Sequence, residues 1–231
     1  YGFNIINWAN NHTLDYLYQG IEDTKRNLTE YGFVEAGVGN NLAEASCPKY
    51  LECPSGRVAL IAAVSSCPEF WVAGEQRPDM IGRPGVNPLR FSTKYVLPEK
   101  ELSVLKEIAK KTYINADKDL AIKEGFSIAE EEGVFTFGGH RFIKGTEAGI
   151  ITEPLEKDMK RINKSIDEAK QMADCVLVSI HSHEMARGRK ELPSEFLITF
   201  ARKCIDAGAD AVIGHGPHIL RGIEIYRNRP I

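Results

Sequence analysis

Short apolar runs and polar loops alternate at the start of the chain. Residues 3–8 form an apolar run that Asn4 and Asn7 interrupt, and the run leads directly into a polar loop over residues 9–12. This pattern predicts a buried strand that delivers polar side chains at its end. A second brief strand is predicted over residues 33–35.

Helical and strand periodicities then follow one another along the rest of the chain. Apolar residues recur at helical spacing in four segments, so we expect helices over residues 14–31, 98–115, 157–172 and 193–207. Further strands are expected over residues 57–64, 175–180, 211–213 and 222–226, with a hairpin over 134–143. Residues 57–64 are apolar almost throughout, which is typical of a strand buried on both faces of a parallel sheet, and we expect helices to cover both sides. The alternation predicts an α/β layered sheet without internal repeats.

The segment over residues 65–93 is rich in proline and glycine, which predicts a long loop without a regular element. Loops of this length are frequently lids or binding loops. Arg83 and Arg90 flank its second half, so an anion-binding lid is one interpretation and a solvated loop is the other.

Composition and charge narrow the class of protein. The 231 residues are 43% hydrophobic and 26% charged, which excludes a disordered tail or a fibre, and one domain over residues 1–231 is expected. The net charge is −3, so no global basic field exists to hold a nucleic acid. No apolar run reaches the roughly 18 residues that span a bilayer. The chain starts at Tyr1 rather than Met, so a signal peptide or anchor upstream of it stays open.

The five cysteines are odd in number and contain no C-x-x-C pair. We interpret them as mostly free thiols, which favours a reducing compartment. A bridge from Cys53 to either Cys47 or Cys67 is the alternative.

Five of the six histidines follow three separate predicted strands. The polar residues released at these three junctions are Asn10, Asn11, His12, His181, His183, Glu184, His215 and His218. Ligands bind beyond the carboxyl ends of strands in open α/β sheets, so we predict that these side chains share one site. Imidazole nitrogens mixed with amide and carboxylate oxygens indicate a hydrolytic metal centre rather than a redox centre.

Three motifs at these junctions resemble the CapA family of capsule synthesis and poly-γ-glutamate biosynthesis proteins. They are ANNHTLD over residues 9–15, SIHSHE over 179–184 and DAGADAVIGHGPH over 206–218, followed by GIEIY over 222–226. The likeness covers the chain from its first residues to its last. It implies a calcineurin-like metallophosphoesterase fold, a four-layer α/β sandwich of the order α-β-β-α.

The resemblance also implies site roles. Asn11, His181 and His218 would hold two divalent ions, which could be Mn, Zn, Fe or Ca. His12 would be the acid that faces the phosphate. Many relatives have His where this chain has Gly216, so either His215 substitutes as a metal ligand or one metal subsite is weakened. Asp15 either orients the His12 ring or caps the following helix. Substrate contacts are expected from Asn10, His183, Glu184, Arg83 and Arg90.

The superfamily's early aspartates come from strands that precede the Asn-Asn-His loop, and relatives continue beyond the last residue of this chain. We therefore expect the chain to be truncated at both ends relative to them, and a complete dinuclear centre to need an upstream Asp.

Three hypotheses on function follow. The first is a metal-dependent hydrolase of the phosphoesterase type that acts on a phosphate-containing or polyanionic, poly-glutamate-like substrate, with capsule synthase proteins as partners. The second is a non-catalytic accessory protein of a polymer synthase complex. The third is a cytosolic hydrolase of a small substrate. The resemblance suggests a cell-surface or membrane-associated location, whereas the free thiols suggest the cytoplasm.

Overall fold

In the computed structural model, which describes residues 2–231, strand β5 (Gly56–Val64) lies inside a four-stranded sheet of the order β14-β11-β5-β4. Strands β11 (Cys175–His181) and β14 (Ala211–His215) run parallel to β5, whereas β4 (Lys49–Cys53) is antiparallel to it. The register places His181 beside both Val64 and His215. The carboxyl ends of β5, β11 and β14 are therefore aligned, and the predicted junctions after β11 and β14 lie at this edge.

Alternate residues of β5 pack into different clusters, because successive side chains of a strand point to opposite faces. Ala59, Ile61 and Ala63 join the core beneath helices α5 (Glu156–Met172) and α6 (Glu195–Ala207). Leu60 and Ala62 pack instead against Ala36. The prediction that 57–64 is buried on both faces is confirmed.

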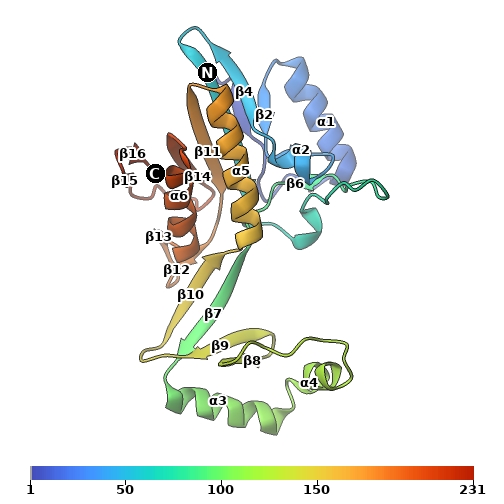
Figure 1. The fold of residues 1–231 in the computed structure, drawn as a ribbon, viewed down its shortest axis with the longest axis vertical. Helices are drawn as coiled ribbons and strands as arrows, with labels where there is room; N and C mark the ends of the chain where they lie inside the picture. The colour runs from blue at the N-terminus through green and yellow to red at the C-terminus, as the bar shows by residue number, and fades with distance from the viewer. Residues whose placement is uncertain (1) are drawn as a thin grey trace. The chain divides into compact units, whose positions relative to one another are not determined.

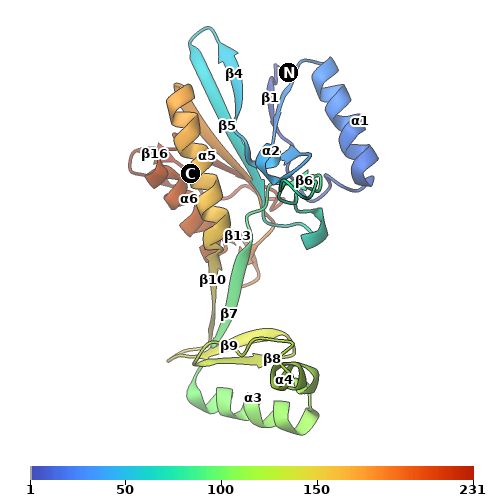
Figure 2. The same cartoon turned by 45° about the vertical axis from the view of Figure 1, so that its right-hand side comes forward.

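The expectation of helices on both sides of β5 is wrong. The second face is covered by strands β1 (Ile5–Asn7) and β2 (Val34–Ala36), which pair in parallel, and helix α1 (Leu17–Glu30) packs outside them. Figures 1 and 2 show α5 and α6 on one side of the sheet and β1, β2 and α1 on the other. Small side chains at Ala36 and Ala62 allow two sheets to approach closely. This unit thus has the layer order helix, sheet, sheet, helix.

The predicted helices and strands of this unit agree with the structure within a few residues. Gly32 after α1 and Gly208 after α6 have φ of +73° and +113°, the left-handed conformation in which helices commonly end. The remaining elements of the unit are short: β3 (Val38–Gly39), α2 (Leu42–Ser46), a 3-10 helix (Glu69–Trp71), β6 (Gly85–Val86), β12 (Met185–Ala186), β13 (Arg189–Pro193), β15 (Ile225–Tyr226) and β16 (Arg229–Pro230).

The segment over residues 65–93 contains more structure than predicted. It holds the 3-10 helix and β6, which pairs with β3, and β7 (Phe91–Leu97) begins at its end. Val86, Asn87 and Leu89 are fully buried. The Asn87 amide donates to the Ala62 carbonyl oxygen at 2.8 Å. The prediction of a segment without regular elements is therefore wrong, because this stretch completes the core beside β5.

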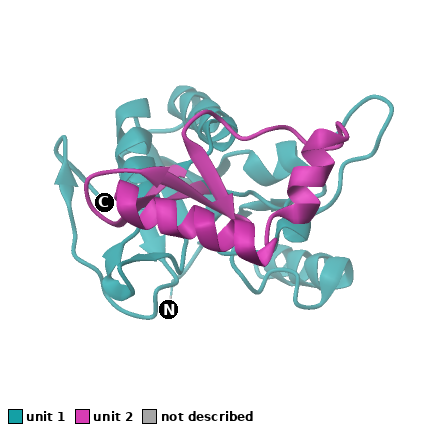
Figure 3. Cartoon of the chain, turned by 90° about the horizontal axis from the view of Figure 1, so that it is seen from below, with its two compact units in different colours: residues 1–91, 154–231 teal, residues 92–153 magenta. Residues whose placement is uncertain are grey.

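The chain divides into two compact units, residues 1–91 with 154–231 and residues 92–153 (Figure 3). In the smaller unit, β7, β8 (Val134–Phe137), β9 (His140–Lys144) and β10 (Gly149–Pro154) form a sheet of the order β10-β7-β9-β8. Helices α3 (Glu99–Thr112) and α4 (Ala116–Lys123) complete it. The hairpin turn at Gly138 and Gly139, both with positive φ, is confirmed. A single CapA-like domain over 1–231 stays a prediction.

All five cysteines are free, as the preferred interpretation of the sequence expects. No helix in the described part of the chain combines the length and the apolar character needed to cross a membrane.

Candidate functional site

The three strand-end junctions meet at His181, the last residue of β11. Its Nε2 lies 3.0 Å from Asn11 Oδ1, in the loop after β1, and 3.1 Å from His183 Nε2. Its Nδ1 lies 3.0 Å from Nδ1 of His215, the last residue of β14. The convergence predicted from the sequence is therefore present, with Asn11, His181, His183 and His215 in one cluster.

Burial shapes the electrostatics of this cluster. The pKa of His181 is lowered to about 4, first because the ring is buried and then because positive charge on His215 and His183 would repel its own. Burial also lowers the pKa of His215. Both rings are therefore neutral near pH 7, which is the state in which imidazole binds a metal ion.

His183 lies as close to His181 as the other members of the cluster do. Strand alternation on leaving β11 keeps both histidines on one side and sends Ser182 to the other. The backbone N–H of His183 donates to Ser66 Oγ at 2.6 Å. This bond fixes the loop after β11 to the loop after β5.

Glu184 acts as an anchor between these two loops. Its Oε2 accepts hydrogen bonds from the hydroxyls of Ser65, Ser66 and Ser182 at 2.8, 2.7 and 2.6 Å. Arg221 donates to the Glu184 carbonyl oxygen at 2.8 Å. The structure gives this carboxylate a local structural role, and its predicted contact with substrate stays a prediction.

His218 and Gly216 complete the cluster from the third junction. The His218 ring centroid lies 5.1 Å from that of His183. Gly216 has φ of +113°, and a Cβ placed there would lie 2.9 Å from the Ser182 carbonyl oxygen and 3.1 Å from Cε1 of His181. A histidine at position 216 does not fit this backbone, and it is His215 that contacts His181.

His12 lies next to Asn11 but points into solvent, with 72% of its side chain exposed. Its Nδ1 lies 2.8 Å from Asp15 Oδ2. Helix α1 begins after Tyr16 without a side-chain cap, so Asp15 orients His12 and does not cap the helix. Asn10 Oδ1 accepts the His12 backbone N–H at 2.7 Å, which fixes the turn that presents both residues.

Arg83 and Arg90 each have partners within the protein. Arg83 donates to the Val72 carbonyl oxygen, with Nη2 at 2.8 Å. Arg90 binds the fully buried carboxylate of Asp158 with Nε and Nη2, both at 2.9 Å, and Glu69 with Nη1 at 3.0 Å. Both arginines thus hold the 65–93 segment in place, and anion binding by them stays a prediction.

Asn7 and Ser179 belong to the site although they were not among the predicted site residues. Asn7 Nδ2 lies 3.0 Å from Nε2 of His215 and donates to Ser179 Oγ at 2.9 Å. Asn7 Oδ1 is buried and has no hydrogen-bond partner. The signal in the sequence was Asn7 itself, a polar residue inside an apolar strand.

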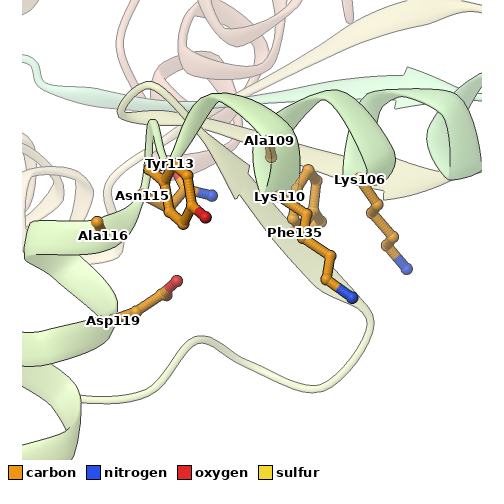
Figure 4. A pocket seen from close by; sticks show the side chains of 8 residues that line it. All are labelled: Lys106, Ala109, Lys110, Tyr113, Asn115, Ala116, Asp119 and Phe135. Atoms are coloured by element: carbon orange, nitrogen blue, oxygen red, sulfur yellow. The ribbon is translucent and has the colours of Figure 1, made fainter.

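Two cavities lie elsewhere, and none of the predicted site residues lines them. One, of about 290 Å³ in the smaller unit, lies among Lys106, Lys110, Tyr113, Asp119 and Phe135 (Figure 4). The other, of about 460 Å³, lies beside α2 and α5. The histidine cluster is therefore distinct from both cavities.

Among residues 2–231, no three or more His, Cys, Asp or Glu side chains are spaced as ligands of one metal ion. The histidines contact one another instead, and an amide, Asn11, supplies the oxygen. Imidazole nitrogens with an amide oxygen nevertheless match the ligand preference of borderline divalent cations. The residue types fit a cation, provided that the rings exchange their mutual hydrogen bonds for coordination.

Comparison with known proteins gives the family. The model of the bacterial capsule synthesis protein PGA_cap matches residues 1–231. The chain belongs to the PGA_cap family. The resemblance predicted from the motifs of the three junctions is therefore confirmed.

The relatives of this PGA_cap chain differ in their sequence identity to it. It is 37% identical over 230 residues to the uncharacterized protein y4sH of Sinorhizobium fredii, covering 100% of this chain and 48% of that protein. It is 23% identical over 226 residues to the capsule biosynthesis protein CapA of Bacillus anthracis, covering 98% of this chain and 37% of CapA. It is 25% identical over 228 residues to a probable polyglutamine synthesis accessory protein of Mycobacterium tuberculosis, covering 96% of this chain and 41% of that protein. The chain spans about half the length of these relatives or less.

Proposed function

We propose that this chain is a metal-dependent hydrolase of the phosphoesterase type that serves the biosynthesis of a capsular or other cell-surface polymer such as poly-γ-glutamate. The observation that carries the proposal is the contact between two distant segments at His181. Asn11 Oδ1 and His183 Nε2 both lie within 3.1 Å of His181 Nε2. The helix, sheet, sheet, helix order of the larger unit supports a metallophosphoesterase-type sandwich. The names of the CapA and accessory relatives support the polymer pathway.

The proposed roles follow from position. Asn11, His181, His183 and His218 would hold divalent cations, which supply a water of lowered pKa and stabilise charge on a phosphoryl group, while His215 contacts His181 through Nδ1. His12 would donate a proton to a leaving oxygen, a role supported by its exposure and its contact with Asp15. Oε2 of the neighbouring Glu184 already accepts three hydroxyls, so a second cation would depend on further ligands.

The proposal is tested on purified protein by metal analysis and by hydrolysis of a nitrophenyl phosphate monoester and diester with Mn, Zn, Fe or Ca. His12→Ala is expected to abolish turnover and keep the metal, whereas His181→Ala is expected to lose both. His140→Ala is the matched control, since His140 lies in the smaller unit against Tyr95. Wild-type protein without bound metal and without turnover contradicts the proposal.

The second candidate is a non-catalytic accessory protein that binds the polymer or its synthase proteins. Two observations favour it: the histidines contact one another rather than surrounding a cation, and one relative carries the name of an accessory protein. Binding of poly-γ-glutamate by wild-type protein that lacks turnover with every metal is the expected result for this candidate.

A further inference from the structure

The hydrogen bonds that join Asn7, His215, His181 and Asn11 form one continuous chain across the site. Asn7 Nδ2 lies 3.0 Å from His215 Nε2, His215 Nδ1 lies 3.0 Å from His181 Nδ1, and His181 Nε2 lies 3.0 Å from Asn11 Oδ1. Each contact has a length at which one proton is shared between two heavy atoms.

The two amides at the ends decide where the ring protons lie. An amide NH₂ only donates, so His215 Nε2 must accept from Asn7, and the proton of the neutral His215 ring is on Nδ1. That nitrogen then donates to His181 Nδ1, which leaves the His181 proton on Nε2. This proton meets Asn11 Oδ1, an amide oxygen that only accepts. Every hydrogen bond of this series can therefore form when each group donates toward the next, from Asn7 to Asn11.

We propose that Asn7 is a positioning residue that sets the tautomer of His215 and, through His215, the tautomer of His181. Asn7 faces the main sheet from β1, where Ser179 Oγ accepts a second hydrogen bond from the same amide nitrogen at 2.9 Å. The amide is thus held at two points on strand β11 and strand β14. This inference deepens the proposed function, because His181 is the central ligand there.

The unpartnered oxygen of Asn7 allows the same series of hydrogen bonds to form with donors and acceptors reversed. When His181 Nε2 gives its lone pair to a cation, the His181 proton must lie on Nδ1, and His215 must then carry its proton on Nε2. That proton needs an acceptor, and Asn7 Oδ1 is a buried acceptor that has no hydrogen-bond partner. A half-turn of the Asn7 amide exchanges Nδ2 for Oδ1, so the same side chain supports both tautomers. Outer partners of this kind typically change metal affinity by about 10- to 100-fold.

The tautomers are measured directly by two-bond ¹H–¹⁵N correlation spectra of the histidine rings, recorded on metal-free protein at neutral pH. Wild type is expected to hold the His215 proton on Nδ1 and the His181 proton on Nε2. Asn7→Ala is expected to give a mixture of His215 tautomers. Asn7→Asp, whose carboxylate only accepts, is expected to move the His215 proton to Nε2. Asn4→Ala is the matched control, an exposed asparagine just before β1.

An unchanged His215 tautomer in both Asn7 variants overturns the proposal, and the Asp variant decides it if the Ala variant fails to fold. Titration with Zn is then expected to reverse both tautomers in wild type, with affinity about 10- to 100-fold lower in Asn7→Ala and near wild type in Asn7→Asp. Equal Zn affinities in wild type and Asn7→Ala also overturn it. If wild type binds no Zn, the proposed function fails, while the metal-free spectra still decide the role of Asn7.

Discussion

His181 and His215 face each other nitrogen to nitrogen, with their Nδ1 atoms 3.0 Å apart, at the ends of two neighbouring parallel strands. The strand register pairs the two residues directly. Because parallel strands in register carry their side chains to the same face, two histidines 34 positions apart in the sequence become contacting neighbours.

Acid is expected to destabilise the metal-free protein through His181. The pKa of this ring is about 4 in the folded chain, against about 6.5 in an unfolded chain. Between these values the unfolded chain binds a proton that the folded chain does not, so the free energy of unfolding falls as the pH drops from about 6.5 to about 4. Urea denaturation in the presence of a chelator measures this slope. His181→Gln should flatten it, and a variant that keeps the wild-type slope would contradict the assignment.

Loss of the Asp158 charge is expected to destabilise the larger unit. Burial alone would raise the pKa of Asp158, but hydrogen bonds and charges from Arg90 and Arg161 hold it below its usual value. Asp158→Asn breaks this buried network and is expected to cost about 3 kcal/mol of unfolding free energy. The control is Glu75→Gln, which breaks an exposed ion pair with Lys157. Like the Arg90–Asp158 pair, this pair joins the 65–93 segment to helix α5. Equal effects of the two substitutions would refute the distinction between buried and exposed pairs.

A side chain at position 216 is expected to disturb the histidine cluster. Gly216→Ala forces a left-handed backbone on alanine and brings its Cβ against Ser182 and Cε1 of His181. The expected cost is about 1–3 kcal/mol in unfolding free energy, with a shift in the His181 ring resonances. Gly222→Ala, where a Cβ meets open space, should leave both unchanged. Wild-type stability and spectra for the position 216 variant would show that the backbone there adapts freely.

The lid hypothesis predicts that Arg83 contacts a polyanion. Arg83 is the suitable residue for the test, because Arg90 also carries the buried pair with Asp158. Arg83→Ala is expected to weaken binding of poly-γ-glutamate about two- to fivefold, measured by titration calorimetry at low salt. Arg77→Ala, which breaks an exposed pair with Asp79, serves as the control. Unchanged affinity in the Arg83 variant would remove the lid from the site.

The fold was predictable where the residues of one short segment determine its conformation. Helix α1 follows the spacing of its apolar residues and ends beside Gly32, and the turn at Gly138 and Gly139 sits where two glycines permit positive φ. Helix α4 and strand β10 were missed. Residues 116–123 in α4 have no buried side chain, so no apolar stripe marks them. Strand β10 is paired with β7 but largely exposed, which also weakens its pattern.

The site was predictable to the extent that it lies at strand ends. The histidines at 181, 183, 215 and 218 follow two parallel strands, and their common edge was enough to predict their meeting. Asn7 was missed as a site residue because its role depends on the opposite sheet, which places it against Ser179 and His215. The sequence predicted Glu184 as a substrate contact and gave no sign of its three serine partners, which lie in the loops after β5 and β11.

The sequence by itself determined the α/β class, the buried strand β5, the family motifs and the gathering of histidines, because these depend on periodicity and on residue types at element ends. Only the tertiary structure decided that strands rather than helices cover the second face of β5, that Arg90 holds a buried carboxylate, and that Asn7 closes a chain of hydrogen bonds to Asn11. Each of these depends on which side chains from distant segments share one small volume, and close packing, rather than local preference, settles that choice.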